Sequence, residues 1–246
     1  LIELGQGTQR IEDSLKAEFP DVSILRIDSD TTKRKGAFME MRGVIEKSEV
    51  DIIVGTQMLA KGHDFPNLSL VVILGSDQSL FSSDFRATER LYQQLLQVSG
   101  RPGRGATEGK VVLQTEFPQH PVYQSLIHET FDDFAQKLLT ERKEALFPPY
   151  CFQALLRVAA KKESSVWSFL SLAQVKALKI KIAELEVYDA VPSPIFKMAG
   201  LYRGQLLIQA TSRSVMRKFL NAWVSEVNAI KENGVRYAFD IDPIDV

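Results

Sequence analysis

The fold is set by Val50-Asp51-Ile52-Ile53-Val54, a nearly continuous apolar run of the kind that is buried on both faces of a parallel sheet. A second such run follows at residues 70–74, and a strand at 111–115 comes after a helix at 88–98. Strands and amphipathic helical patterns alternate from the start of the chain. This alternation predicts one α/β lobe, residues 1–117, with a parallel sheet and crossover helices.

Prolines interrupt the alternation after this lobe. Pro118 and Pro121 break the pattern, a helical segment follows, and Pro148-Pro149 ends that segment. We therefore expect a helical linker at 118–149. Further on, strands and helices no longer alternate one by one, so residues 150–246 are predicted to form a smaller α+β domain.

The composition excludes several classes of protein. Of the 246 residues 45% are hydrophobic and 25% charged, as in soluble globular proteins, and no apolar run approaches the roughly 20 residues that span a bilayer. The single cysteine, Cys151, excludes an internal disulfide framework and a cysteine-based zinc site and favours a cytoplasmic location. No metal site is expected, because no histidine has a partner at ligand spacing. The start, which has no methionine, suggests a fragment.

The net charge does not indicate a nucleic-acid binder. Lysine and arginine number 30 against 31 aspartates and glutamates, which gives a formal charge of −1. A local basic face remains possible, because the total averages over surfaces that meet different partners.

The strongest chemical signal lies at the end of the predicted helix, in Gln97-Val98-Ser99-Gly100-Arg101-Pro102-Gly103-Arg104-Gly105. Two arginines three residues apart, separated by glycine, can present their guanidinium forks to a polyphosphate. Such a pair suits the stabilisation of charge on a phosphoryl group during transfer. A lone pattern of this kind can equally be a basic surface turn, so the context has to decide.

That context is the segment Gly55-Thr56-Gln57-Met58-Leu59-Ala60-Lys61-Gly62-His63-Asp64-Phe65-Pro66. It follows a buried strand, where the carboxyl ends of parallel strands carry ligand-binding loops, and we expect the two loops to be neighbours. Together they resemble motifs V and VI of the superfamily 2 helicases. The string Asp84-Phe85-Arg86-Ala87-Thr88-Glu89-Arg90, with Ile27-Asp28-Ser29-Asp30-Thr31-Thr32, is similar to the PriA family of bacterial replication-restart DNA helicases.

This resemblance implies a RecA-like second helicase lobe at 1–117. Arg104 would be the arginine finger, with Arg101 and Gln97 beside it on the nucleotide face. The other residues that it implies on the nucleotide side are Asp64, Gly62, Gly100 and Gly103. The chain departs from the family at Ser99 and Pro102, where alanines are usual; proline stiffens the loop and keeps the arginine spacing.

The resemblance also implies contacts with the DNA backbone. Thr56, with Gln57 and Lys61, would contact phosphate oxygens, while turn or cap roles stay open for Thr56 and Asp64. Thr8, which follows Gly5-Gln6-Gly7 at a helix start, is a further candidate phosphate contact. Helix capping is the favoured role for Thr8. A dinucleotide fingerprint is rejected here, because Arg10 occupies the position of the third glycine.

In the C-terminal domain, Tyr202 and Arg203 precede a predicted strand and could stack a base and grip a phosphate. A solvated hairpin is the favoured alternative. For this domain the resemblance implies a fold like that of ribosomal protein S10. It also implies binding of branched or forked DNA, of single-strand DNA-binding protein and of other primosome proteins, and no contact with a membrane. The family's zinc ligands would precede Leu1 and are absent from this chain.

The chain has no G-x-x-x-x-G-K-[ST] loop and no acidic strand end for Mg²⁺, so ATP and Mg²⁺ would be bound mainly by a lobe that it lacks. We expect the C-terminal part of an ATP-dependent 3′→5′ DNA helicase that recognises stalled or branched forks and starts primosome assembly. The fragment alone should be inactive. The alternatives are a lobe of another superfamily 2 translocase, such as a RecG-like motor, and a non-enzymatic nucleic-acid-binding module. The ending Asp240-Ile241-Asp242-Pro243 favours the PriA family.

Overall fold

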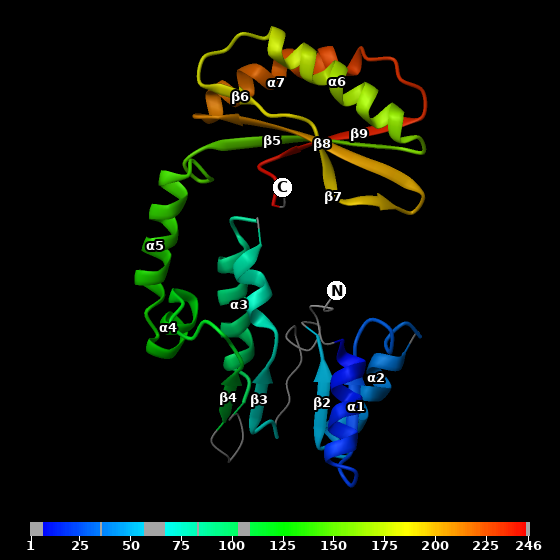
Figure 1. The fold of residues 1–246 in the computed structure, drawn as a ribbon, viewed down its shortest axis with the longest axis vertical. Helices are drawn as coiled ribbons and strands as arrows, with labels where there is room; N and C mark the ends of the chain where they lie inside the picture. The colour runs from blue at the N-terminus through cyan, green and yellow to red at the C-terminus, as the bar shows by residue number, and fades with distance from the viewer. Residues whose placement is uncertain (1–6, 35, 57–66, 83, 103–108, 245–246) are drawn as a thin grey trace. The chain divides into compact units, whose positions relative to one another are not determined.

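The computed structural model describes residues 7–34, 36–56, 67–82, 84–102 and 109–244 and contains two compact units (Figure 1). The first comprises residues 1–134 and the second residues 135–246. The division falls within α5 (Phe131–Glu144), inside the segment predicted as a helical linker.

The first unit alternates helices with short parallel strands. Its elements are α1 (Thr8–Glu18), β1 (Ile24–Ile27), α2 (Ala37–Glu46), β2 (Ile52–Gly55), β3 (Leu70–Ile73), the 3₁₀ helix η2 (Ser76–Phe81), α3 (Ala87–Ser99), β4 (Lys110–Leu113) and α4 (Pro121–His128). β1 pairs with β2 and β3 pairs with β4, both in parallel. The predicted α/β lobe with parallel strands and crossover helices is confirmed.

Helix α3 is anchored by one apolar face. Leu91, Tyr92 and Leu95 are buried, as their spacing along a helix predicts for a single face. The Tyr92 ring stacks on Phe134, with 4.9 Å between ring centroids, and lies 5.4 Å from Phe131. These rings fix the direction in which α3 leads to the segment Gly100-Arg101-Pro102-Gly103-Arg104, called the glycine–arginine loop below.

A hydrogen-bonded carboxylate joins η2, the end of β4 and α4. Asp77 accepts hydrogen bonds from the hydroxyls of Tyr123 at 2.6 Å and Thr115 at 2.7 Å, and from the backbone N–H of Glu116 at 2.8 Å. Burial raises the pKa of Asp77, but these hydrogen bonds and the nearby His120 together lower it by more, so the net shift is downward. The ionised carboxylate therefore holds three elements of the first unit together.

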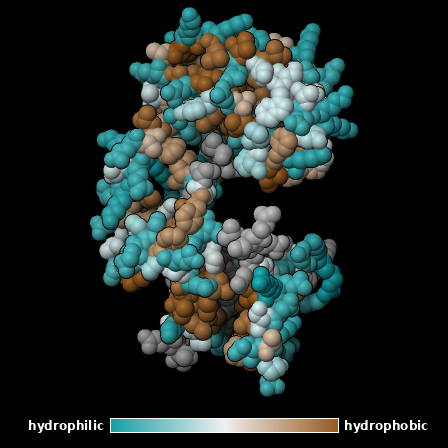
Figure 2. All heavy atoms as spheres, viewed as in Figure 1, coloured by the Kyte–Doolittle hydropathy of each residue, from teal (hydrophilic) through white to brown (hydrophobic). Residues whose placement is uncertain are grey.

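The pair β3–β4 carries an exposed apolar face. The register matches Val72 with Val112, and Leu70, Val72 and Val112 are all exposed. Brown spheres gather over these two strands in Figure 2. The prediction that the run at 70–74 is buried on both faces is wrong within the described residues, because nothing among them covers this face.

The second unit is an antiparallel sheet with two helices on one face (Figure 1). Its elements after α5 are β5 (Phe152–Ala160), α6 (Glu163–Lys179), β6 (Leu185–Val187), β7 (Val191–Met198), β8 (Leu201–Ala210), α7 (Arg213–Asn228) and β9 (Val235–Ile241). The strand order is β6–β8–β5–β9, and β7 also pairs with β8. The predicted α+β class of this part is confirmed.

The core of this unit lies between the sheet and its helices. Alternate residues of β5 and β8, such as Leu156 and Ile208, are fully buried there, because side chains of a strand alternate between its faces. Trp223 of α7 is also fully buried, and its indole N–H donates to the carbonyl of Ala173 in α6 at 2.9 Å. The core role expected for the stripe of Met216, Phe219 and Trp223 is confirmed.

Gly204 lets α6 approach β8. A Cβ at this position would lie 2.8 Å from Leu170 Cδ1 and 3.0 Å from Val166 Cγ1. Both side chains belong to α6 and are fully buried, so neither can move aside freely. Glycine at this point of the strand is therefore required by packing.

Gly204→Ala is expected to lower the free energy of unfolding by about 1–3 kcal/mol, as overpacking of a core does. Urea unfolding followed by tryptophan fluorescence measures this, because both tryptophans, Trp167 and Trp223, belong to the second unit. Gly43→Ala is the control for an added methyl group, since a Cβ there meets no atom within 4 Å, and its unfolding is followed by far-UV circular dichroism because Gly43 belongs to the first unit. An equal midpoint for Gly204→Ala and the unchanged chain would contradict the packing argument.

Candidate functional site

The glycine–arginine loop begins where α3 ends. Gly100 closes the helix, with its N–H donating to the carbonyl of Leu96 at 3.2 Å, and the N–H of Arg101 donates to Val98 at 3.2 Å. Gln97 is exposed on the last turn, and Arg101 is half-buried. The structure thus brings Gln97, Gly100 and Arg101 together within one turn of chain.

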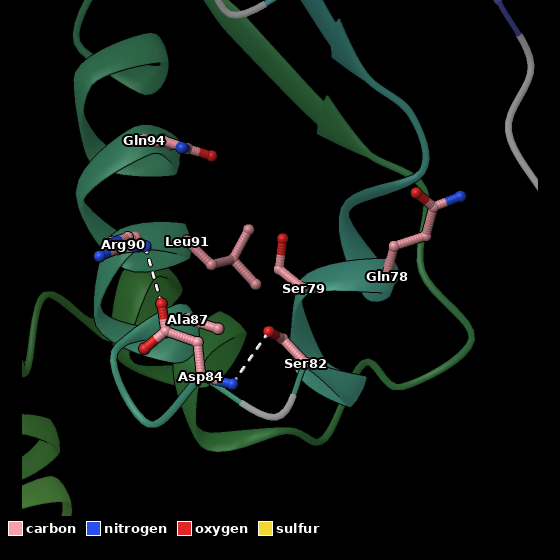
Figure 3. Close-up of a pocket in the computed structure, with 8 residues that line it drawn as sticks. All are labelled: Gln78, Ser79, Ser82, Asp84, Ala87, Arg90, Leu91 and Gln94. Carbon is pink, nitrogen blue, oxygen red and sulfur yellow. Dashed lines mark hydrogen bonds and ion pairs between the residues drawn. The ribbon is translucent and has the colours of Figure 1, made fainter. Parts of the chain in front are cut away.

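A pocket of about 300 Å³ lies at the other end of α3 (Figure 3). Its lining comes from η2, the following loop and α3: Gln78, Ser79, Ser82, Asp84, Ala87, Arg90, Leu91 and Gln94. Arg90 donates to the Asp84 carboxylate at 2.8 Å, and Asp84 also accepts from the backbone N–H of Arg86 at 2.9 Å. The carboxylate offsets the guanidinium charge, so the pocket is polar without a strong charge of its own.

The pocket and the loop share one face of α3. Arg90, Gln94 and Gln97 stand at positions i, i+4 and i+7, which project from the same side of a helix. A polar row therefore runs from the pocket toward Gly100. The sequence reasoning missed the ion pair Asp84–Arg90, because it joins a loop to a helix at a separation that no regular pattern marks.

The order of the strands does not support the expected closeness of the two motif-like loops. Thr56 is exposed and follows the carboxyl end of β2, as predicted. Gly100 and Arg101, however, follow α3 and come before β4, which is parallel to β3. A crossover helix returns the chain to the amino edge of a parallel sheet. The position predicted for both loops, at the carboxyl ends of the strands, therefore applies to the loop after β2 and not to the loop after α3.

Several predicted site residues lie outside the described part of the chain. They are Gln57, Lys61, Gly62 and Asp64 of the first loop and Gly103 and Arg104 of the second. Their assignments remain predictions.

Thr8 has a definite partner. Its hydroxyl donates to Asp28 at 2.6 Å, and α1 has no side-chain cap, so the capping role favoured for Thr8 is wrong. Asp28, 7% exposed, also accepts from the backbone N–H groups of Asp30 and Thr31, and Arg26 lies 3.2 Å away. The Thr8 hydrogen bond, with these other contacts, lowers the pKa of Asp28 to about 2. The Thr8 hydroxyl proton is therefore engaged within the unit.

Tyr202 and Arg203 lie on opposite faces of the second unit's sheet. Tyr202 packs against the core on the helix side, with the Phe196 ring 5.5 Å away and Lys197 Nζ 4.4 Å above its own ring. Arg203, the next residue of β8, points to the other face. The two side chains cannot stack and grip the same nucleotide, as their adjacency in sequence had suggested.

The described residues hold no group of three or more metal-ligating side chains. Cys151 is buried, and burial raises the pKa of its thiol to about 11, which makes it a poor nucleophile and ligand at neutral pH. Among the described helices, none is both long enough and apolar enough for a bilayer span.

Two family models match the chain. The helicase conserved C-terminal domain covers residues 2–106, and the primosomal protein N C-terminal domain covers residues 143–244. Replication restart protein PriA of Haemophilus influenzae is 40% identical over 246 residues, which are 100% of this chain and 34% of that protein. The chain belongs to the PriA family.

Other PriA proteins match over the same region. Those of Synechocystis and Bacillus subtilis are each 35% identical, over 98% and 97% of this chain and 29% and 30% of their own lengths. The chain thus spans about a third of these relatives and corresponds to the C-terminal part of PriA. The match at 143–244 decides against a RecG-like translocase. Among solved structures, a de novo designed protein is 13% identical to this chain and covers 37% of this chain and 96% of its own. The TM-score of 0.28 is too low to indicate a common fold.

From the contacts of Asp28 with Thr8, Thr31 and Arg26 we predict that the stability of the chain depends on pH. Because its pKa is lower in the folded chain, Asp28 contributes stability above pH 4 that is lost as the pH falls toward 2. Asp28→Asn should cost about 1–2 kcal/mol at pH 7, and the difference from the unchanged chain should shrink toward pH 2.

Urea unfolding followed by far-UV circular dichroism at a series of pH values measures both effects. Asp30→Asn is the control, because the exposed Asp30 carboxylate forms a surface ion pair with Lys33. If Asp28→Asn keeps the full acid sensitivity of the unchanged chain, the hydrogen bond from Thr8 does not stabilise the ionised form.

Proposed function

We propose that the intact protein is an ATP-dependent 3′→5′ DNA helicase that recognises stalled or branched replication forks and starts primosome assembly. This chain would contribute the second, RecA-like motor lobe and a C-terminal DNA-binding and partner-binding domain. The observation that carries the proposal is the glycine–arginine loop at the end of α3, in a chain whose relatives are named as replication restart proteins. ATP and Mg²⁺ would be held mainly by a lobe outside this chain.

The chemistry assigned to the loop is electrostatic. Arg104 would act as the arginine finger, and Arg101 and Gln97 would lie beside it, facing the triphosphate. A guanidinium stabilises developing charge best when it is already in position, and the buried face of α3 gives the loop a fixed base. Gly100 and Gly103 would lie on the same nucleotide side. The family resemblance assigns Asp64 and Gly62 to that side too, although the strand order among the described residues does not by itself bring their loop to Gly100.

The DNA side of the lobe would include Thr56, with Gln57 and Lys61. The exposure of Thr56 at the end of β2 supports this role, because its hydroxyl is accessible to a phosphate. Thr8 is a weaker candidate, since its hydroxyl already donates to Asp28. Any phosphate contact there would use backbone N–H groups at the start of α1.

For the second unit we propose a fold like that of ribosomal protein S10 and contacts with forked DNA, single-strand DNA-binding protein and other primosome proteins. The antiparallel sheet with both helices on one face supports this assignment, since it leaves the other face of the sheet without a helix. The zinc of the family would be bound by residues outside this chain.

The motor proposal is tested in a chimera in which this chain replaces the C-terminal region of Haemophilus influenzae PriA. Arg104→Ala should lower DNA-stimulated ATP hydrolysis about a thousandfold or more, because an arginine finger contributes that much to turnover. Arg101→Ala should also lower it. DNA affinity, measured by fluorescence anisotropy, should change little.

Arg217→Ala, an exposed arginine of α7, is the control and should leave hydrolysis unchanged. Retained turnover in the Arg104→Ala chimera would refute the motor role of the loop. A raised Kd for DNA with normal turnover at saturating DNA would favour the non-enzymatic binding module instead.

A further inference from the structure

We propose that the helix-free face of the second unit's sheet binds the sugar–phosphate backbone of a nucleic-acid strand through Arg157, Arg203 and Arg236. This proposal rests on the proposed DNA-binding function and assigns it to one face and one end of the sheet. It replaces the pairing of Arg203 with Tyr202 that adjacency in the sequence suggested.

The strand register places the three arginines together. Arg203 of β8 lies opposite Ala159 of β5, and Ala159 lies opposite Arg236 of β9. Directly paired residues project from the same face, so the two arginines flank Ala159 in one row across three strands, with Cα atoms about 10 Å apart. Arg157, two residues from Ala159 along β5, points to the same face.

This face is the one without helices. Gly204, the neighbour of Arg203 in β8, abuts Leu170 and Val166 of α6 and so marks the helix side. Arg203 therefore points away from α6. The aromatic residues of these strands, Tyr202, Tyr237 and Phe239, belong to the helix side as well, because they are paired with or adjacent to residues of the core.

The surface between the arginines consists of small side chains. Ala159 lies between Arg203 and Arg236, and Ala238 lies opposite Arg157. Arg236 and Ala238 are exposed, and Arg203 and Ala159 are half-buried. A polynucleotide backbone can approach a methyl-lined floor closely enough for guanidinium forks on both sides to reach its phosphates.

The charge at this end of the sheet is positive. Lys161 and Lys162, both exposed, directly follow β5 at the same end. Asp240 accepts hydrogen bonds from Arg157 Nε at 3.1 Å and Nη2 at 3.0 Å, and it is paired with Leu155, four residues along β5 from Ala159. Clustered like charges disfavour folding, and an anionic partner would relieve that repulsion.

Part of this face is covered. Gln205, which is paired with Arg157, is only 4% exposed, and Leu155, two residues from Arg157 along β5, is fully buried. The proposed site is therefore confined to the end of the sheet at Ala159, where Arg203 is half-buried and Arg236 is exposed.

Binding at this face would depend on the backbone and not on base stacking, because the described aromatic rings of β8 and β9 lie on the other side. Such binding weakens steeply with salt, by a slope of about 0.7 per phosphate contacted on a single strand. The slope of the affinity against salt concentration therefore measures how many phosphates the arginines contact.

The test uses the 246-residue chain, a fluorescein-labelled single-stranded oligonucleotide and a forked DNA, with anisotropy titrations over a series of salt concentrations. The double variant Arg203→Ala/Arg236→Ala should raise the Kd about tenfold or more and reduce the salt slope by about 1.4. Arg217→Ala/Lys218→Ala removes the same charge from exposed positions of α7 and should change the Kd less than about twofold. Tryptophan-monitored unfolding checks that each variant is folded.

The proposal is overturned if the unchanged chain binds neither DNA, or if the two double variants bind equally well. It is also overturned if Arg203→Ala/Arg236→Ala loses only the binding of a poly-glutamate peptide, since the face would then serve an acidic protein segment. The variant Arg203→Lys/Arg236→Lys should bind DNA more tightly than Arg203→Ala/Arg236→Ala but less tightly than the unchanged chain, because lysine keeps the charge without the forked geometry.

The chimera separates this proposal from the motor proposal. In it, Arg203→Ala/Arg236→Ala should raise the DNA concentration for half-maximal ATPase stimulation about tenfold and leave kcat at saturating DNA unchanged. Arg104→Ala should lower kcat and leave the DNA concentration for half-maximal stimulation unchanged. Loss of kcat in the sheet variant would overturn the sheet proposal, whereas normal kcat in Arg104→Ala would overturn the motor proposal alone.

Discussion

The antiparallel pairing of β5 with β8 is the constraint on which the second unit depends. Nine residue pairs, from Phe152 with Ala210 to Ala160 with Tyr202, fix which side chains meet α6 and α7 and which meet the other face. A slip of one residue would turn the apolar set outward and bring Arg203 and Gln205 under the helices. The buried Leu156 and Ile208, together with the missing side chain of Gly204, hold the register in place.

In the first unit, the corresponding constraint is the burial of one face of α3. Leu91, Tyr92 and Leu95 anchor the helix, which leaves Arg90, Gln94 and Gln97 on a polar side and fixes where the loop at Gly100 begins. An arginine that stabilises a transferring phosphate has to be held before the reaction starts. The burial of one side of α3 therefore supports the proposed role of the loop, because it determines where the chain leaves the helix.

The weak net charge of the chain conceals two differently organised charge clusters. Around Asp28, hydrogen bonds and Arg26 stabilise one buried carboxylate inside the lobe. On the sheet, Arg157 donates to the Asp240 carboxylate, and Arg203 and Arg236 lie near Arg157 on the neighbouring strands. The first arrangement stabilises the fold, and the second has the form of a surface for an anionic polymer.

The sequence by itself determined the α/β lobe, the α+β module and the family, because periodicity and the run from Gln97 to Gly105 are local properties of the chain. It also placed Gln97, Gly100 and Arg101 in one turn, as helix geometry requires. It could not show that Thr8 binds Asp28, or that Asp84 pairs with Arg90 beside a pocket, since these contacts depend on how the chain returns on itself. Nor could it group Arg157, Arg203 and Arg236. Residues that are far apart along the chain become neighbours only through strand register, and residues that are adjacent, such as Tyr202 and Arg203, are separated by the two-residue alternation of a strand.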